Sequence, residues 1–368
     1  MSLVPPRILL LARSCNVSGM IDELHKRSPD AYYCLDNKKQ RVPDGMKPFT
    51  LTTAWKLRQA IRENQYALVI SCANPDPLWR QDRNWFSNAL KCLKKVVRNP
   101  GALGFYLVPW MLSRSNVPLA VYDWEDNTII PRKNWGLLRR ATCYFKTQTP
   151  RNPYKAFLFQ DKRNDDIFNI VKQPVYVEWA KKLRPICIGI TIPENWSALQ
   201  STEKKTDVFF AGAVHYSWAR IEGIRQLEEL RAEGFNIDLH VLGPGVATLP
   251  SDEFLRRCSE AWLVWSPEGA GWDCMRHYWA PMMNSVPLLN HPDTRRYLPL
   301  IDGVHALYYG VEDTDLKRVV KLALSDKKRL RQMAVDGEAF VRPHHTHPAL
   351  AEYLIVETLR TAANPSTD

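Results

Sequence analysis

Short apolar runs alternate with amphipathic stretches along the first half of the chain. Helical spacing of apolar residues is found over 19–26 and 52–64, between runs that have the length and continuity of buried β-strands. These strand-like runs cover residues 7–12, 31–36, 66–72, 117–124, 141–147 and 184–190. Strands of this kind, bounded by turn residues and separated by helices, predict a parallel sheet with helices on both faces.

The same alternation begins again after a polar stretch. Residues 191–206 carry Pro, Asn, Ser and charged residues without an apolar period, which predicts an interdomain linker. Beyond it, the pattern predicts strands over 207–213, 235–243, 261–267, 286–290 and 305–310, and helices over 220–234, 252–260, 274–284 and 313–324.

Two successive sets of βα units predict an α/β protein with two Rossmann-like, doubly wound domains that face a cleft. We expect the first domain over 1–195 and the second over 196–345. The last segment, 346–368, contains a helix that either crosses back to the first domain or ends the second.

Composition excludes several classes of protein. The 16 Gly and 26 Pro are scattered among 368 residues without a period, which excludes collagen-like and low-complexity chains. No run reaches the roughly 18 apolar residues that a transmembrane helix needs, and the N-terminal segment does not resemble a signal peptide. The eight cysteines show no CxxC spacing or Cys/His cluster, which favours reduced thiols over disulfides or zinc. We therefore expect a cytoplasmic protein.

The charge indicates an acidic partner. Fifty Lys and Arg against 39 Asp and Glu give a net charge of +11, and such an excess is typical of proteins that meet nucleic acid, an anionic membrane or a phosphorylated substrate. Residues 83–119 hold six basic residues, no acidic one and several aromatics. This stripe suits anionic lipid or single-stranded nucleic acid, and it also suits a core helix with a solvated basic face.

A phosphate site is predicted in residues 266–289. A strand ends at Ser266, a small-residue loop follows over 268–271, and a helix begins near Asp273, which we expect to be its N-cap. The free amides and positive dipole end of such a helix favour a phosphate, and Arg276 and His277 lie in its first turn. The glycines match neither GxGxxG nor a Walker loop, so a standard dinucleotide or ATP site is not indicated.

The same segment resembles the donor-binding segment of GT-B glycosyltransferases. The likeness rests on P-E-G-x-G, then R-H-Y, then a helix followed by S-V-P-L-L. It is nearest to the bacterial group-1-like and spore-maturation-type branches and covers about residues 205–340. The resemblance implies a nucleotide-sugar site lined by Glu268, Gly269, Arg276, His277 and Tyr278.

Two positions depart from that family's pattern. The helix glutamate that commonly holds the ribose falls at Trp279, and the usual glycine before V-P is Asn284 or Ser285. The ribose contact is therefore assigned to Glu268 as the alternative.

A second segment, 207–220, agrees with this resemblance. It places a strand before Gly212, which allows close backbone approach, and the resemblance gives Arg220 the role of neutralising the diphosphate. His215, between them, is assigned to the same donor site.

The first domain is expected to bind the acceptor and to supply a catalytic base. Asp123, Glu125 and Asp126 follow a predicted strand, and ligands of open α/β sheets bind at the carboxyl ends of strands. An inverting transfer needs a base for the acceptor hydroxyl proton. Asp123 is the leading candidate, with Glu125 and His25 behind it, and Lys146 is assigned to the acceptor or a phosphate.

The sequence therefore predicts a glycosyltransferase that moves a sugar from a nucleotide-sugar donor to a glycan or lipid-linked acceptor, in bacterial cell-surface glycan or glycolipid synthesis. No cofactor is expected, and no metal, because no DxD pair lies in a suitable loop and HHTH at 344–347 is too tightly spaced for a tetrahedral site. The basic stripe favours an anionic membrane as a further partner. A nucleic-acid-binding or DNA-base-glycosylating protein, and a noncatalytic sugar-binding protein, remain alternatives.

Overall fold

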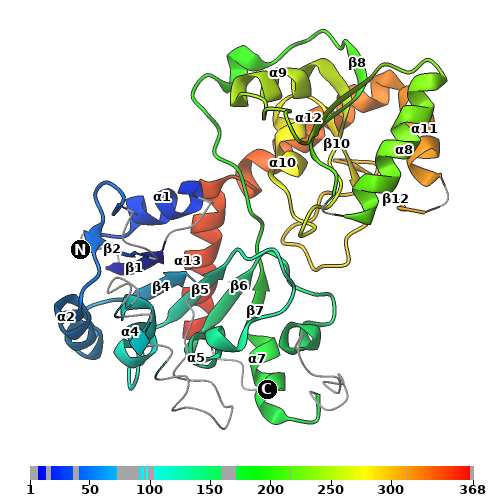
Figure 1. Cartoon of the computed structure of the whole chain (residues 1–368). Coiled ribbons are helices and arrows are strands. Elements are labelled where there is room, and N and C mark those ends of the chain that lie inside the picture. The colour runs from blue at the N-terminus through cyan, green and yellow to red at the C-terminus, as the bar shows by residue number, and fades with distance from the viewer. Residues whose placement is uncertain are drawn as a thin grey trace. The chain divides into compact units, whose positions relative to one another are not determined.

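The chain divides into two compact units (Figure 1). Unit 1 comprises Met1–Ile186 and Ala351–Asp368, and unit 2 comprises Cys187–Leu350. The computed structural model describes residues 7–13, 18–35, 41–72, 90, 93–94, 97, 103–158, 171–215, 217–312 and 314–364.

Unit 1 is built on a seven-stranded parallel sheet with the strand order β3-β2-β1-β4-β5-β6-β7. Its strands are β1 Ile8–Arg13, β2 Asp30–Cys34, β3 Lys47–Pro48, β4 Leu68–Cys72, β5 Leu119–Asp123, β6 Cys143–Lys146 and β7 Leu183–Pro185. Its helices are α1 Ser18–Arg27, α2 Leu51–Arg62, α4 Leu103–Met111, α5 Trp135–Arg140 and α7 Pro174–Lys181, with single turns η2 Arg132–Asn134 and η3 Pro153–Phe157. The strand order reverses between β1 and β4.

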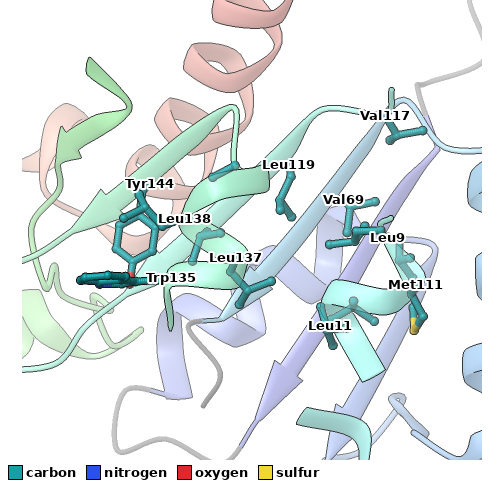
Figure 2. Packing of buried hydrophobic residues seen from close by; sticks show 14 of the residues in the cluster. Leu9, Leu11, Val69, Met111, Val117, Leu119, Trp135, Leu137, Leu138 and Tyr144 are labelled. Atoms are coloured by element: carbon teal, nitrogen blue, oxygen red, sulfur yellow. The ribbon is translucent and has the colours of Figure 1, made fainter. Parts of the chain in front are cut away.

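The apolar runs of unit 1 are continuous because both faces of the sheet are covered. Leu9, Val69 and Leu119 lie in register on β1, β4 and β5. Figure 2 shows them in one row, with Met111 of α4 and Leu137 of α5 nearby. All five are fully buried in a single cluster. Burial of this kind contributes about 25 cal/mol for each Å² of apolar surface, so the cluster stabilises the packing of α4 and α5 on the sheet.

The last helix, α13 His347–Ala363, packs on unit 1 from Ala351 onward. The Tyr353 ring meets Phe145 of β6 edge-on at 5.4 Å, and Glu357 accepts a 2.7 Å hydrogen bond from Arg184 of β7. Residues four apart lie on one helix face, so one side of α13 covers the β6–β7 part of the sheet (Figure 1).

Unit 2 is built on a five-stranded parallel sheet with the strand order β12-β11-β10-β8-β9. Its strands are β8 Thr206–Ala213, β9 Ile237–Leu242, β10 Ala261–Trp265, β11 Val286–Asn290 and β12 Leu307–Tyr309. Its helices are α8 Trp218–Ala232, α9 Ser251–Glu260, α10 Met275–Met282, α11 Asp315–Leu324 and α12 Lys327–His344, with the turn η4 Trp196–Leu199. Here the strand order reverses between β8 and β10.

Local chemistry sets the ends of α8 and its distance from the sheet. The Ser217 hydroxyl accepts a hydrogen bond from the Arg220 amide, as an N-cap does. Gly234 follows the helix with φ +99°, the left-handed conformation that glycine adopts without strain. Inside the helix, a Cβ on Gly223 would lie 2.1 Å from the buried Trp265 ring, so α8 packs directly on β10.

Three details differ from the sequence-based expectation. The stretch 191–206, expected to be a linker, belongs to unit 2, where the Lys204 amine donates to the carbonyls of Ser259 and Ala261. Helix α12 is an additional long helix that continues through Pro343 in its last turn. The HHTH sequence at 344–347 is typical of a polar hinge before the last helix, but His345 and His347 are buried. In the described part of the chain, no helix is both long and apolar enough to cross a bilayer.

Candidate functional site

The reversal of strand order in unit 2 brings the two predicted donor segments together. Ligands of open α/β sheets bind where the strand order reverses, beyond the carboxyl ends of the strands. Arg220, from the first turn of α8, donates from Nε to the Glu268 carbonyl at 2.8 Å and from Nη1 to the Ala213 carbonyl at 2.6 Å. The segment after β8 and the loop after β10 are therefore joined by one buried guanidinium.

Arg276, from the first turn of α10, reaches the same edge. Its Nη1 donates to the Ala211 carbonyl at 2.8 Å, and its guanidinium lies over the Phe210 ring at 5.2 Å. Its Nε and Nη2 are buried and have no hydrogen-bond partner among the residues that the structure describes. A buried donor without a partner costs about 1–3 kcal/mol, and more when it is charged. An anionic ligand that accepts from these atoms would remove that cost.

Two glycines make room for the two arginines. A Cβ on Gly212 would lie 2.9 Å from Arg276 Nη1, and a Cβ on Gly269 would lie 2.7 Å from Arg220 Nη2. Neither glycine has a positive φ, so close approach, and not backbone conformation, is the reason for glycine at both positions.

Glu268 is held in place by Asn290 at the end of β11. Its amide donates to Asn290 Oδ1 at 2.8 Å, and its carboxylate accepts from Asn290 Nδ2 at 3.2 Å. Burial raises the pKa of the Glu268 carboxyl above its usual range. The loop after β10 thus presents a half-buried carboxyl whose orientation is set by a neighbouring strand.

A cavity of about 670 Å³ adjoins Gly212 and Arg276 within unit 2. It lies beside the ends of β8 and β9 and the first turns of α9 and α10, and Thr191 and Pro193 complete its wall. Trp279 lines it with Leu242, Leu249, Phe254 and Leu255, and Asp252 adds a carboxylate. A largely apolar wall with a few convergent polar groups is typical of sites for small organic ligands.

His277 and Tyr278 lie in the interior of unit 2 and do not line this cavity. The His277 Nε2 atom lies 2.8 Å from the Trp272 carbonyl, so Nε2 carries the proton and Nδ1 accepts from the Ser266 hydroxyl. Burial lowers the pKa of His277 to about 3. The Tyr278 hydroxyl donates to Asp273 at 2.7 Å. Both side chains therefore hold the loop between β10 and α10 from the interior of unit 2. His215 is not part of this group and lies in the exposed turn after β8.

In unit 1, Asp123 and Lys146 are paired inside the sheet. Adjacent strands place them side by side, and Lys146 Nζ lies 3.2 Å from Asp123 Oδ2, with both side chains fully buried. Tyr144 donates to the same oxygen at 2.8 Å, and the Glu125 amide donates to Oδ1 at 3.1 Å. Both carboxylate oxygens of the leading base candidate are therefore engaged, and the Lys146 side chain is fully buried.

Glu125 is the candidate carboxyl of unit 1 that retains solvent exposure together with a defined partner. Its side chain is 23% exposed, and Arg13 Nη2 lies 3.4 Å from it at the end of β1. The Arg13 guanidinium also lies over the Trp124 ring at 5.2 Å. His25 does not join this group. It lies in the last turn of α1, which leads to the start of β2. His25 is therefore near the N-terminal ends of the strands, whereas Glu125 follows the C-terminal end of β5.

Four of the six basic residues of the stripe over 83–119 lie outside the described residues. Within it, Lys94 and Arg114 are exposed, and Trp110 packs between Trp55 and Arg58 of α2. Its contact with lipid or nucleic acid stays a prediction. Among the residues that the structure describes, no group of three or more His, Cys, Asp or Glu side chains is placed to hold a metal ion.

Three solved structures resemble the whole chain in fold. HepE from Anabaena, in complex with UDP, is 12% identical, with a TM-score of 0.53 and 96% of this chain and 100% of that chain covered. A glycosyltransferase from Rickettsia africae gives 8% identity, a TM-score of 0.53 and coverage of 98% and 100%. An α-glucosyltransferase in complex with UDP and a 13-mer DNA gives 11%, 0.51, and 97% and 100%. The chain has the GT-B fold. No protein-family model and no curated protein sequence matches it.

Sequence reasoning missed several groups of this GT-B chain that the structure places at the site. The sequence identifies Trp279 as a departure from the family pattern, but it does not indicate that Trp279 lines the cavity. Asn290 is a polar residue at the end of a strand. The same signal identified Asp123 as a candidate, so Asn290 could have been predicted in the same way. Thr191 and Pro193 carry no such signal, because they reach the cavity only through the folding of a segment without regular structure.

Proposed function

We propose that this protein is a glycosyltransferase that moves a sugar from a nucleotide-sugar donor to an acceptor hydroxyl. The observation that carries the proposal is the set of side chains at the C-terminal ends of β8 and β10 in unit 2. Two arginines lie there beside two glycines, and Arg276 keeps two buried donor atoms without a partner among the described residues. A cavity adjoins Arg276 and Gly212. This arrangement suits a ligand with an anionic centre and a bulky organic end.

We propose UDP as the nucleotide, because HepE and the α-glucosyltransferase of the same fold each hold UDP. The diphosphate lies against Arg276 and Arg220, and the nucleoside enters the cavity beside Trp279. Negative charge develops on the diphosphate as it leaves. Fixed cations at short range stabilise that charge in a site that excludes water. These arginines provide such cations, so the reaction is proposed to need no metal.

On the acceptor side, we propose Glu125 as the base, ahead of Asp123. A base must come within hydrogen-bond reach of the acceptor hydroxyl. Asp123 is fully buried with its oxygens engaged, whereas part of the Glu125 carboxylate is exposed. The acceptor is proposed to be a glycan or a lipid-linked sugar of a bacterial cell surface. Exposed Leu51 and Trp55 beside Arg58 and Arg62 on α2 favour an anionic membrane surface as its source.

The test is nucleotide binding followed by turnover. UDP, GDP, CMP and dTDP, and sugars linked to them, are screened for a rise in melting temperature, since binding to the folded state alone raises it. We expect UDP to give the largest rise, and Arg220→Ala to reduce it and to slow donor hydrolysis. Arg225→Ala is the matched control, because Arg225 lies on the exposed face of the same helix. No binding of any of these nucleotides by the wild-type protein overturns the proposal.

A second candidate is transfer to DNA. The net charge of +11 and the DNA bound to the α-glucosyltransferase of the same fold favour it. DNA binding that weakens steeply with salt, together with sugar incorporation into DNA, supports this acceptor. Donor binding without hydrolysis or transfer to any acceptor instead supports a noncatalytic sugar-binding protein.

A further inference from the structure

Asp273 connects the proposed donor loop to a distant segment of unit 2. It lies directly before α10, whose N-cap is Cys274 and not Asp273 as the sequence predicted. The Asp273 side chain is buried and caps no amide of α10. Its Oδ2 accepts from the Ile188 amide at 2.6 Å, and its Oδ1 accepts from Tyr278 and from Arg296. One carboxylate thus joins three parts of the chain that lie far apart in sequence.

Arg296 completes this cluster from the loop between β11 and β12. Its guanidinium lies over the Trp272 ring at 4.8 Å and donates to the Tyr278 hydroxyl at 2.8 Å. The Arg296 and Asp273 side chains are 4% and 1% exposed. Removing one partner of a buried ion pair leaves an uncompensated charge, which is far more costly than a lost surface contact. The pair therefore fixes Trp272 and Asp273, the residues that join the donor loop to α10.

The segment held by Asp273 includes the start of unit 2. The chain passes from unit 1 to unit 2 between Ile186 and Cys187 and returns between Leu350 and Ala351. Close to both passages, the Ile190 amide donates to the His345 carbonyl at 3.1 Å, and the His347 amide donates to the Ile190 carbonyl at 2.9 Å. The Thr191 hydroxyl lies 2.7 Å from His347 Nδ1.

The same segment forms a wall of the donor cavity. Thr191 and Pro193 line the cavity together with residues of α10, among them Arg276. Gly189, between Ile188 and Ile190, has φ +69°, and a Cβ there would lie 2.5 Å from Leu350 Cδ1. The two walls of the cavity are therefore connected through the Asp273–Ile188 hydrogen bond, and the segment leaves little room for adjustment.

We propose that Asp273 and Arg296 are positioning residues for the donor: they hold α10 with Arg276 at a fixed distance from the 188–193 wall of the cavity. This inference rests on the proposed function, since it assigns the nucleotide to that cavity. It also means that a nucleotide in the cavity stabilises the segment on which the chain enters unit 2, although Ile188 itself does not line the cavity.

The test combines nucleotide affinity with amide exchange. UDP is titrated into the full-length wild-type protein and into Asp273→Asn, Arg296→Met and Arg296→Lys, and hydrogen exchange over 187–193 is followed with and without UDP. We expect UDP to slow exchange at Ile188 and Ile190 in the wild type. In Asp273→Asn we expect the dissociation constant for UDP to rise at least tenfold and this slowing to disappear. Arg296→Lys keeps the charge, so its affinity should lie between those of the wild type and Arg296→Met.

Glu357→Gln is the matched control, because it removes an ion pair with Arg184 within unit 1. It should leave both the UDP affinity and the protection of Ile188 unchanged. Folded Asp273→Asn or Arg296→Met with wild-type affinity and wild-type protection overturns the inference alone. If the Asp273→Asn chain does not fold, Arg296→Lys decides, and wild-type behaviour of that variant overturns the inference. Failure of the wild-type protein to bind UDP or any other nucleoside diphosphate overturns the proposed function as well.

Discussion

Both units place charged side chains where their parallel strands end, but the charges have different partners. In unit 1, Asp123 and Lys146 neutralise each other between adjacent strands, out of contact with solvent. In unit 2, Arg276 donates to a main-chain carbonyl and retains two buried nitrogen atoms that find no partner in the described part of the chain. A charged residue at a strand end is therefore not sufficient evidence for a ligand site. What distinguishes the two edges is whether the protein itself supplies the counter-charge.

The largest effect is expected from breaking the pair in unit 1. Asp123→Asn leaves the Lys146 ammonium buried without its counter-charge, so we expect the free energy of unfolding to fall by about 3–5 kcal/mol. Urea denaturation measures this loss. The double variant Asp123→Asn with Lys146→Met removes both charges and should recover most of the stability.

The double variant also separates a structural role from a catalytic one. If Asp123 is the base, turnover remains lost when stability returns. If the pair only supports the sheet edge, turnover per folded molecule returns as well, and Glu125→Gln is then the variant that abolishes it. A single variant that is as stable as the wild type contradicts the buried pair.

The second effect concerns the unsatisfied cation of unit 2. Arg276→Ala removes donors aimed at developing charge, so we expect kcat to fall by about 10²–10³ with little loss of stability. The fold tolerates the change because the orphaned nitrogens gain nothing from the protein. Steady-state kinetics with the donor identified by the thermal screen measures it. If Arg276→Ala loses as much stability as Asp123→Asn but keeps its turnover, Arg276 has a structural role and not a catalytic one.

The sequence predicted six of the seven strands of unit 1 and all five strands of unit 2, because continuous apolar runs are what two-sided burial requires. It missed β3, whose two residues are exposed and form no apolar run. It also predicted the loop after β10 and the helix that follows it, with Arg276 in the first turn of that helix. That this loop binds the donor stays a prediction, and His277 and Tyr278 lie in the interior of unit 2. It did not predict that Lys146 neutralises Asp123, because that contact depends on the register of two strands joined by 19 intervening residues. Helix α12 was missed although Leu330, Met333, Ala334 and Val341 follow helical spacing.

The buried titratable groups add a third point to the comparison, because unit 2 buries neutral histidines in addition to its charged Asp273–Arg296 pair. Burial lowers the pKa of His277 to about 3 and that of His345 to about 4. In the unfolded chain both have a pKa near 6.5. The protonated form therefore favours unfolding. The stability is fully present above pH 6.5 and is lost as the pH falls towards about 4 and then 3.

Each of these histidines should lower the folding constant by up to tenfold for every pH unit below 6.5. Urea midpoints of the wild type at pH 7.5, 6.0 and 5.0 measure the loss. His277→Gln, whose side chain does not titrate, should make the decline shallower. Identical slopes for the two proteins would remove His277 from this explanation.

The smallest effects are expected at the two glycines that admit the arginines. In Gly212→Ala the new Cβ meets Arg276 Nη1 at 2.9 Å and the Phe210 ring at 3.2 Å, so the guanidinium is displaced while a buried ring limits where it can move. In Gly269→Ala the three atoms nearest to the new Cβ all belong to the end of the Arg220 side chain, of which Nη2 is the closest at 2.7 Å, and no ring lies among them. We expect a several-fold weaker UDP affinity for the first variant and a smaller change for the second. Gly243→Ala is the control, because no atom lies within 4 Å of its Cβ. Equal UDP affinity of Gly212→Ala and Gly243→Ala would show that the close approach of Arg276 to β8 does not determine nucleotide binding. The cavity would then be the one remaining feature that distinguishes the strand ends of unit 2 from those of unit 1.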